Sequence, residues 1–397
     1  MSAETTSPSG DARPSWQNIA WVLAPVVLLM AALWWLIAGN LLGHFSNGAP
    51  PVEALTVERT ILDQNGLRLL MRGGGSEPMT IAQVQVDAAY WRFTQDPPGP
   101  IARGSTAWIA IPFPWVLAEA HKVTFVTNTG ATFEHDIPVA VETPQVTSLN
   151  FAAQAMLGAF VGILPVVIGL MFYPVLRGAG PSVMSFLLAM TVGLLLFLLI
   201  DTIEDALEFA EKSAAIFQGP MMVILAAAAS FILLLGLSRR RGAPTGLALA
   251  TYIAIGIGLH NLGEGLAIGA AFAAGAAGLG TFLVMGFTLH NITEGVGIAA
   301  PLLKIKPSLA QFALLALIAG GPAVIGMWAG SLAYAPHWSA LALAIGAGAI
   351  FQVVVEVAAF LTRSSEDPVK GLMTPPVLLG IAAGLALMYA TAMLVKI

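Results

Sequence analysis

Cysteine is absent from this chain of 397 residues, and charged residues make up only 10% of it. Without cysteine there is no disulfide, no thiolate metal ligand and no thiol nucleophile. Any metal site must therefore be built from nitrogen and oxygen donors. The net charge of −5 comes without a basic cluster of the kind that binds nucleic acid, so we expect no nucleic-acid partner.

Hydrophobic residues are abundant instead, at 57% of the chain with a mean hydropathy of +0.83. Soluble domains of this size carry far more charge, so we expect an integral protein of the cell (inner or plasma) membrane. The first apolar run, 16–43, is too long for the apolar region of a signal peptide and has no A-x-A-like cleavage site behind it. It is predicted to be a retained transmembrane anchor helix, preceded by a disordered cytoplasmic N-terminus over 1–15.

Residues 44–148 differ from the rest because apolar and polar residues alternate in short runs such as TIAQVQVDA and KVTFVTN. This alternation predicts strands with one buried face, and short strands separated by Gly, Pro and Asn are typical of a small β-sandwich. TNTGAT, at Thr127–Thr132, is expected to form a hairpin turn. His121 and His135 are expected at the surface of this domain.

From residue 149 to residue 397 the chain is almost entirely apolar, which predicts an all-α polytopic membrane domain. We expect an eight-helix bundle, preceded by the anchor helix and the β-sandwich. The eight apolar segments are 151–175, 183–204, 218–237, 246–270, 279–301, 308–332, 338–361 and 374–395.

Lysine and arginine are concentrated in alternate loops of this domain, and the positive-inside rule assigns such loops to the cytoplasm. The β domain is then extracytoplasmic. The cytoplasmic set is Arg177, Arg239, Arg240, Arg241, Lys304, Lys306, Arg363 and Lys370, against Lys212 and Lys396 on the other side.

Two similar motifs, LHNLGEG from Leu259 and LHNITEG from Leu289, lie inside apolar segments, where a charged side chain costs about 2.5–3.5 kcal/mol. His260 and Glu264 are four residues apart and share one helix face, as do His290 and Glu294. Two imidazoles and two carboxylates make a complete ligand set for zinc, and they also suit ferrous iron or manganese.

The two helices are expected to run antiparallel, which brings the histidine of one level with the glutamate of the other. Substrate sites between related helices at the middle of the membrane are common in transporters. The alternative for the four residues is that they only pair with one another and hold the helices together.

Paired H-N-x-x-E-G motifs on the fourth and fifth of eight helices resemble the ZIP (Zrt/Irt-like) family of divalent metal transporters, over residues 151–397. The resemblance implies a transport site made by His260, Glu264, His290 and Glu294. Asn261 and Asn291 match the family's second, adjacent metal site. The family also implies a homodimer in which the first, fourth, fifth and sixth helices move as a unit.

Two departures from the family pattern affect these expectations. The sixth helix, which reads LIAGGPAVIGM, lacks the glutamate that completes a two-metal centre, so we expect one tightly held metal. The loop SRRRGAPTG lacks a histidine-rich stretch, so metal sensing by this loop is not expected.

Four further polar residues are candidates for a metal route. Asp201 and Glu204 belong to an acidic stripe at the outer end of the second helix, where they could gather cations. Gln352 and Glu356 are four residues apart on the seventh helix, where ZIP proteins also tend to carry a glutamate. The alternatives are an ordinary solvated helix end for the first pair and an interhelical hydrogen bond for the second.

Together these features predict a transporter, and not an enzyme, that moves a divalent metal into the cytoplasm. Zinc is the first candidate, and iron, manganese, cobalt and cadmium fit the same donors. The β domain is expected to bind an extracytoplasmic partner or carrier. The alternatives are a metal-responsive sensor or receptor and an intramembrane metallohydrolase, although neither motif has the H-E-x-x-H order of such hydrolases.

Overall fold

The computed structural model describes residues 16–39, 51–143, 148–178, 180–240, 242–273, 277–332, 335–363 and 367–395. The chain divides into two compact units, Met1–Pro51 and Val52–Ile397. The predicted N-terminal tail (1–15) lies outside the described residues, as do the end of the predicted anchor and the beginning of the predicted β domain (40–50).

The first unit contains one helix, α1 (Trp16–Ala38), among its described residues. Its apolar stretch Leu23–Leu36 is shorter than the helices of the second unit that could span a membrane. Large apolar side chains such as Leu28 and Trp34 are exposed along it. The predicted anchor segment is therefore helical, and its membrane crossing stays a prediction.

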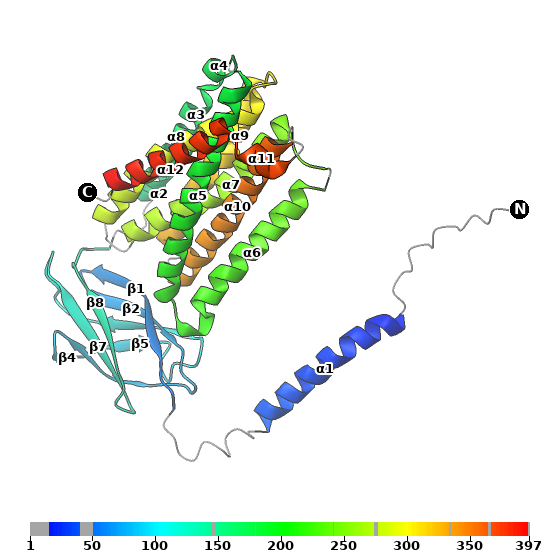
Figure 1. Cartoon of the computed structure of the whole chain (residues 1–397). Helices are drawn as coiled ribbons and strands as arrows, with labels where there is room; N and C mark the ends of the chain where they lie inside the picture. Colours follow the sequence, from blue (N-terminus) through cyan, green and yellow to red (C-terminus); the bar gives the residue numbers. More distant parts are fainter. Residues whose placement is uncertain are drawn as a thin grey trace, which may run out of the picture. The chain divides into compact units, whose positions relative to one another are not determined.

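The second unit begins with two four-stranded antiparallel sheets, in the orders β1-β2-β6-β5 and β4-β3-β7-β8 (Figure 1). Alternate residues of β2 and β7 are buried, and side chains of both sheets, among them Leu69, Met71 and Phe125, form one core. The predicted sandwich packing is thus present. The strands are β1 (Leu55–Asp63), β2 (Gly66–Gly73), β3 (Ile81–Val86), β4 (Ala89–Trp91), β5 (Thr94–Asp96), β6 (Thr106–Ile111), β7 (His121–Thr127) and β8 (Thr132–Ile137).

The predicted hairpin turn joins β7 to β8, where the register pairs Val126 with Thr132. The expectation of surface histidines is wrong for His121, which is buried with its Nδ1 2.8 Å from Asp87 Oδ2. His135 is partly buried, and its Nε2 lies 2.9 Å from Thr60 Oγ1.

The rest of the second unit is helical, and each of the eight predicted apolar segments forms a helix. Among the described residues, seven helical segments are long and apolar enough to cross a membrane. The eighth, α8 (Ala277–Ala299), is not among them, because the polar residues of its motif lower its mean hydropathy. The others are α2 (Ser148–Gly158) continued by a π-helical turn (Ala159–Ile163), α3 (Leu164–Leu170) and α4 (Tyr173–Leu176); α5 (Pro181–Glu211); α6 (Gly219–Ser238); α7 (Gly246–Ala273); α9 (Leu309–Leu332); α10 (Pro336–Thr362); and α12 (Pro375–Val395), with a short α11 (Pro368–Leu372) before it.

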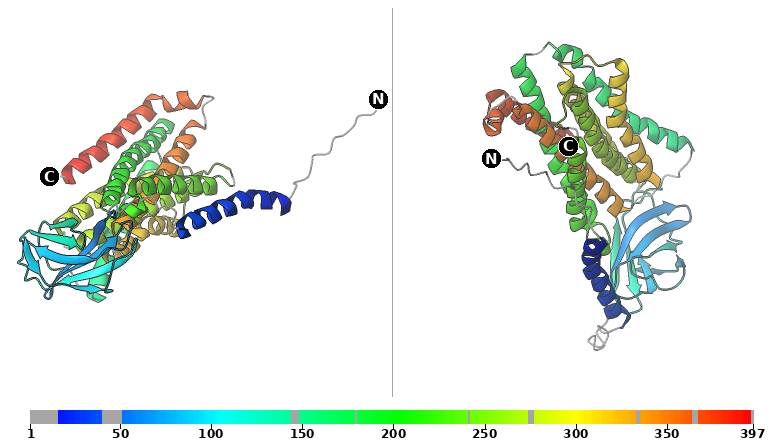
Figure 2. Two further views of the ribbon diagram at one scale, coloured as in Figure 1. Left: turned by 90° about the horizontal axis from the view of Figure 1, so that it is seen from below. Right: turned by 90° about the vertical axis from the view of Figure 1, so that its right-hand side faces the viewer.

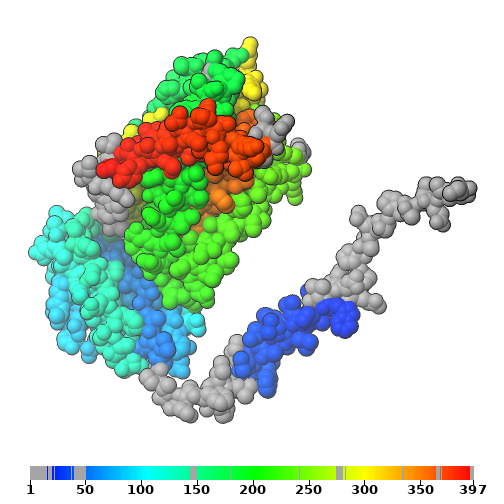
Figure 3. Space-filling view, in the orientation of Figure 1, coloured from blue at the N-terminus to red at the C-terminus, as the bar shows by residue number. Residues whose placement is uncertain are grey.

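The long helices pack in two groups (Figures 1 and 2). In the first group, α7 lies along α9, α8 lies along α3, and α2 packs on α9. In the second group, α5 lies along α12 and α10, and α6 packs on α10. Figure 3 shows α12, in red and orange, on the outside of this group. The two groups meet chiefly where α7 packs against α10.

Glycines allow the backbones to approach within each group. A Cβ added at Gly162 would lie 2.3 Å from the carbonyl oxygen of Gly320, and one at Gly384 would lie 2.2 Å from that of Met190. Between the groups, glycines mostly face side chains. A Cβ added at Gly256 would lie 2.4 Å from Cγ2 of Val353, and one added at Gly297 would lie 2.7 Å from Cγ2 of Thr191. The contacts inside each group are therefore tighter than those between the groups.

Strand β1 contacts the ends of helices from both groups. The Arg59 Nη1 donates to the carbonyl of Leu332 at the end of α9, at 3.3 Å. The buried Glu58 accepts from Arg72 at 2.5 and 3.0 Å and lies 3.4 Å from Nδ1 of His337 in α10. The His337 ring stacks on Phe217 with 4.1 Å between the ring centroids. The β domain thus touches both helix groups.

The glycine contacts predict a local loss of stability when a methyl group is added. Gly384→Ala forces α12 away from the α5 backbone and should lower the free energy of unfolding by about 1–3 kcal/mol. Gly236→Ala is the matched control, because nothing lies within 4 Å of its added Cβ. Melting temperatures of the purified full-length variants measure the effect. Equal melting temperatures for the two variants would contradict the described packing of α12.

The Glu58 cluster predicts a pH-dependent contribution to stability. Burial raises the pKa of this carboxyl, but the neighbouring His337 ring and the hydrogen bonds from Arg72 outweigh it and hold the pKa below the ordinary 4.5. Ionised Glu58 therefore stabilises the fold above about pH 4.5, and this contribution is lost as the pH falls through the lowered pKa. Glu58→Gln should destabilise the protein by about 2 kcal/mol at neutral pH.

Melting curves of the full-length protein between pH 3 and pH 7 test this expectation. The difference between the wild type and Glu58→Gln should be largest at neutral pH and should shrink in acid. Glu134→Gln removes an exposed carboxylate that pairs with Lys122 in the same domain, and it should change little. A Glu58→Gln effect that is the same at every pH would refute the assignment.

Candidate metal centre

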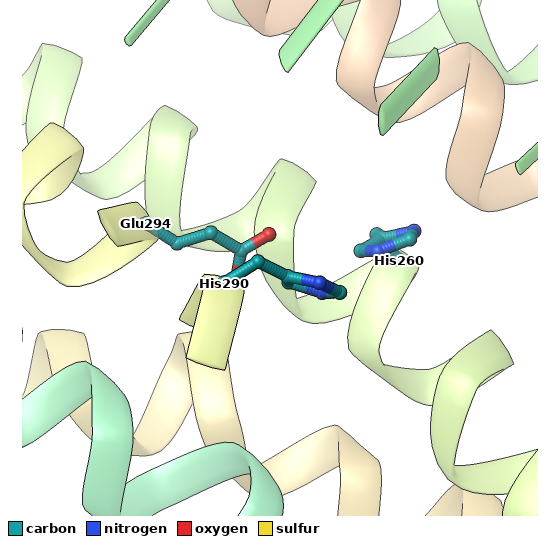
Figure 4. A group of neighbouring side chains, drawn as sticks. All are labelled: His260, His290 and Glu294. Atoms are coloured by element: carbon teal, nitrogen blue, oxygen red, sulfur yellow. The ribbon is translucent and has the colours of Figure 1, made fainter. Parts of the chain in front are cut away.

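Helices α7 and α8 carry the two motifs and bury the histidine, the asparagine and the glutamate of each. The four predicted primary ligands are 1–7% exposed, and both asparagines are fully buried. His260 lies on α7, and His290 and Glu294 lie one turn apart on α8 with their side chains directed toward His260 (Figure 4). The i, i+4 spacing therefore gathers these side chains on facing sides of neighbouring helices.

His260, His290 and Glu294 form a group that could hold a metal ion. One donor atom from each lies within 4.8 Å of the other two. Glu264 lies beside this group, because its Oε1 lies 2.9 Å from Nε2 of His260 and 2.7 Å from Nε2 of His290. One carboxylate oxygen thus holds both imidazoles, and the contact to His290 is the cross-helix contact expected for antiparallel neighbours.

Glu294 lies in the same group with its carboxylate unsatisfied. Neither oxygen accepts a hydrogen bond of good geometry from a described residue, although the Asn261 amide lies nearby. A buried carboxylate without a partner is strongly unfavourable unless it binds a proton or a cation. The orphaned oxygens of Glu294 are therefore an independent indication that this group accepts a cation.

The donor set determines which cations fit. Two imidazole nitrogens with carboxylate oxygens, and no sulfur, suit zinc, ferrous iron, manganese or cobalt, and they are poor ligands for magnesium or calcium. Each histidine presents Nε2 to the group, because both Nε2 atoms point at the Glu264 oxygen. The arrangement suits reversible coordination of a metal by side chains that are already in place.

The two asparagines, predicted as a weak second metal site, bind backbone carbonyls instead. Asn261 Nδ2 donates to Ala319 O and Asn291 Nδ2 donates to Val161 O, both at 3.0 Å. Both carbonyls lie near irregularities: Ala319 comes three residues before Pro322, which lies inside α9, and Val161 lies in the π-helical turn, four residues before Pro165. Pro165 has no N–H to donate to the residue four positions earlier, and the Asn291 amide supplies a donor to that residue, Val161.

The predicted route residues fall at two places. Asp201 and Glu204 lie on α5, with Asp201 close enough to interact electrostatically with His290 and Glu204 exposed. Gln352 and Glu356 are buried on α10, and Glu356 Oε1 accepts from Ser238 Oγ at 2.7 Å and from Arg239 Nε at 3.0 Å. The second pair therefore lies with the end of α6. A role of either pair in transport stays a prediction.

Two residues that contact His260 were not predicted from the sequence. Thr202 of α5 places its Oγ1 3.3 Å from Nδ1 of His260. Gly346 of α10 packs against the same residue, and a Cβ added there would lie 3.0 Å from its Cα. Each is a small residue in an apolar helix and carries no motif of its own. The second helix group therefore touches the metal centre at His260.

The sequence matches no known protein family and no curated protein. No family is therefore assigned, and the inference of function depends on the site itself. The structure supports a multi-helix apolar domain with a buried His/His/Glu group that could bind metal.

The variant Glu294→Gln distinguishes an effect on metal binding from an effect on the stability of the fold. Removing a buried unpaired carboxyl should leave the melting temperature of the metal-free protein unchanged or raised, whereas the rise on adding zinc should disappear. For the wild type, zinc at about one hundred times its dissociation constant should stabilise the fold by about 2.7 kcal/mol. Thermal melting with and without zinc measures both effects.

Glu208→Gln is the control for this experiment. Its carboxylate is exposed on α5 and pairs with Lys212, so the variant should keep the full response to zinc. A wild-type zinc response in Glu294→Gln would remove this residue from the site.

Proposed function

We propose that this protein is a membrane transporter that moves a divalent metal, zinc first, into the cytoplasm. The metal is the substrate, and the protein is not an enzyme. The observation that carries the proposal is the buried group of His260, His290 and Glu294, with Glu264 bonded to both imidazoles. Such a group in the interior of apolar helices indicates a cation pathway or a cation site.

The resemblance of the two H-N-x-x-E-G motifs to those of ZIP transporters supports the same function. The first group (α2 to α4, α7, α8 and α9) corresponds to the first, fourth, fifth and sixth of the eight predicted apolar segments. These are the helices that the resemblance expects to move together, in a homodimer. Backbone contacts at glycine within each group, and mostly side-chain contacts between the groups, suit movement of one group along the other. The metal ligands would travel with the first group.

The expected direction of transport depends on orientation. The β domain contacts Leu332 and His337, at helix ends on the side that the distribution of lysine and arginine places outside the cytoplasm. An outer β domain, with a cavity of about 480 Å³ lined by β1, β8, Lys212 and Pro336, suits reception of a metal or of an extracytoplasmic carrier. Uptake toward the cytoplasm is the direction that fits this arrangement.

A hydrolytic role is less well supported by the geometry. Intramembrane metallohydrolases place two histidines on one helix with a glutamate base between them and keep one metal position open for water. Here the histidines come from different helices, and they form the candidate metal group with Glu294, while Glu264 is bonded to both imidazoles. This arrangement favours binding and release over catalysis.

Uptake into proteoliposomes that enclose a metal-sensitive dye tests the proposal. The double variant His260→Ala/Glu264→Ala removes two of the four donors and should lower the rate of zinc uptake by more than about tenfold. Comparing zinc, cadmium, iron, manganese and cobalt in the same assay identifies the substrate among the metals that the donors admit.

The matched control is His121→Gln, which removes a histidine of the β domain that lines neither the metal centre nor the cavity and should transport normally. Size-exclusion chromatography and melting curves establish that each variant is folded. A folded double variant that transports at the wild-type rate would disprove the site.

A further inference from the structure

The metal centre has one hydroxyl contact that comes from outside its own helix group. Thr202 lies on α5 and is 2% exposed, and its Oγ1 lies 3.3 Å from Nδ1 of His260. The Nε2 atom of the same ring faces Glu264 and the metal group. The two nitrogens of His260 therefore have separate partners, one inside the site and one behind it.

The bond made by Thr202 differs from those of three other threonines within the long helices. Thr191, Thr251 and Thr288 each donate to the carbonyl four residues earlier in their own helix. This back-bonding is the usual behaviour of a helical threonine. In the described contacts, by contrast, the hydroxyl of Thr202 forms its hydrogen bond with the side chain of His260, which lies on another helix.

We propose that Thr202 is a positioning residue that orients His260 for the metal and couples its affinity to the relative position of the two helix groups. A histidine that binds metal through one nitrogen almost always donates the N–H of the other to an acceptor, which fixes the tautomer and the ring orientation. The Thr202 hydroxyl is such an acceptor, and in the metal-free protein it can donate to the same nitrogen, because a hydroxyl does both. The inference rests on the proposed transport function.

The coupling follows from the two groups that share this bond. His260 belongs to the first helix group through α7, whereas Thr202 belongs to the second through α5. A displacement of one group along the other separates Thr202 from His260, and His260 then loses the partner that holds its ring. Metal affinity is therefore highest in the described arrangement and falls when the groups shift. A transporter needs this difference in order to bind metal on one side and release it on the other.

The test compares four forms of the full-length protein: the wild type, Thr202→Val, Thr202→Ser and Thr191→Val. Valine keeps the shape of threonine and removes the hydroxyl, whereas serine keeps the hydroxyl. Thr191 is the matched control because it lies on the same helix, is also 2% exposed and bonds only its own helix among the described contacts. Zinc affinity is measured by calorimetric titration of the purified protein.

Thr202→Val should weaken zinc binding by about tenfold or more, the usual effect of removing such an outer partner. Thr202→Ser should stay within about threefold of the wild type, and Thr191→Val should match it. In uptake assays, Thr202→Val should raise the KM for zinc without lowering the maximal rate. Wild-type affinity in Thr202→Val, or an equal loss in Thr191→Val, would overturn the proposal.

A spectroscopic readout distinguishes orientation of the ring from general packing. The chain has six histidines, so the ¹⁵N resonances of the imidazoles can be assigned with a His260→Gln variant. In the zinc-bound wild type, the Nδ1–H proton of His260 should show the downfield shift of a hydrogen bond to Thr202, and in Thr202→Val this shift should be lost. An unchanged spectrum in Thr202→Val would also refute the role.

The controls separate this inference from the proposed function. If His260→Ala/Glu264→Ala abolishes zinc binding and uptake while Thr202→Val leaves both unchanged, the transport site stands and the role of Thr202 fails. If zinc uptake survives the double variant, the proposed function fails first.

Discussion

Inside a bilayer no water satisfies a polar group, and this constraint governs the arrangement of the helical domain. Two helical segments carry an irregularity, Pro322 inside α9 and the π-helical turn before Pro165. Near each irregularity a backbone carbonyl accepts from a side-chain amide of α7 or α8. The helices that carry the candidate metal group are therefore attached to these two segments through hydrogen bonds and glycine contacts.

The same constraint explains the difference between the two carboxylates of the metal centre. Glu264 is satisfied by two imidazoles, and its position is fixed by them. Glu294 has no comparable partner among the described residues. Glu264 therefore holds the two imidazoles in place without a cation, whereas Glu294 leaves a buried carboxylate that a cation could satisfy.

Much of this centre could be predicted from the sequence because histidine and glutamate stand out in an apolar segment. Their i, i+4 spacing determines a shared helix face, and the repeat implies a facing pair. The bonds of Asn261 and Asn291 could not be predicted, because they depend on which broken helix packs beside each asparagine. The contact between Thr202 and His260 could not be predicted for another reason. A threonine in a helix normally donates to its own backbone, so the neighbouring sequence does not indicate a contact with another helix.

The fold was predictable to a similar degree. The alternation of apolar and polar residues identified the strands, and the length of the apolar runs identified the helices. Helix α8 is less apolar than a usual membrane span because it carries His290, Asn291 and Glu294. The burial of His121 escaped prediction because it depends on Asp87, which has a positive φ of 52° in the turn before β4. The local sequence pattern predicts the helices and strands, but the hydrogen-bond partner of a single polar side chain can be identified only in the packed structure.

Strand β1 reaches α9 through Arg59 and α10 through Glu58, which are adjacent residues on one strand. Adjacent residues of a paired strand cannot follow two helices that move apart, so the proposed shift of α9 past α10 would break one of these contacts. Under that proposal, a movement of the helices would change the environment of strand β1, where a fluorophore or spin label can be attached without touching the helical bundle.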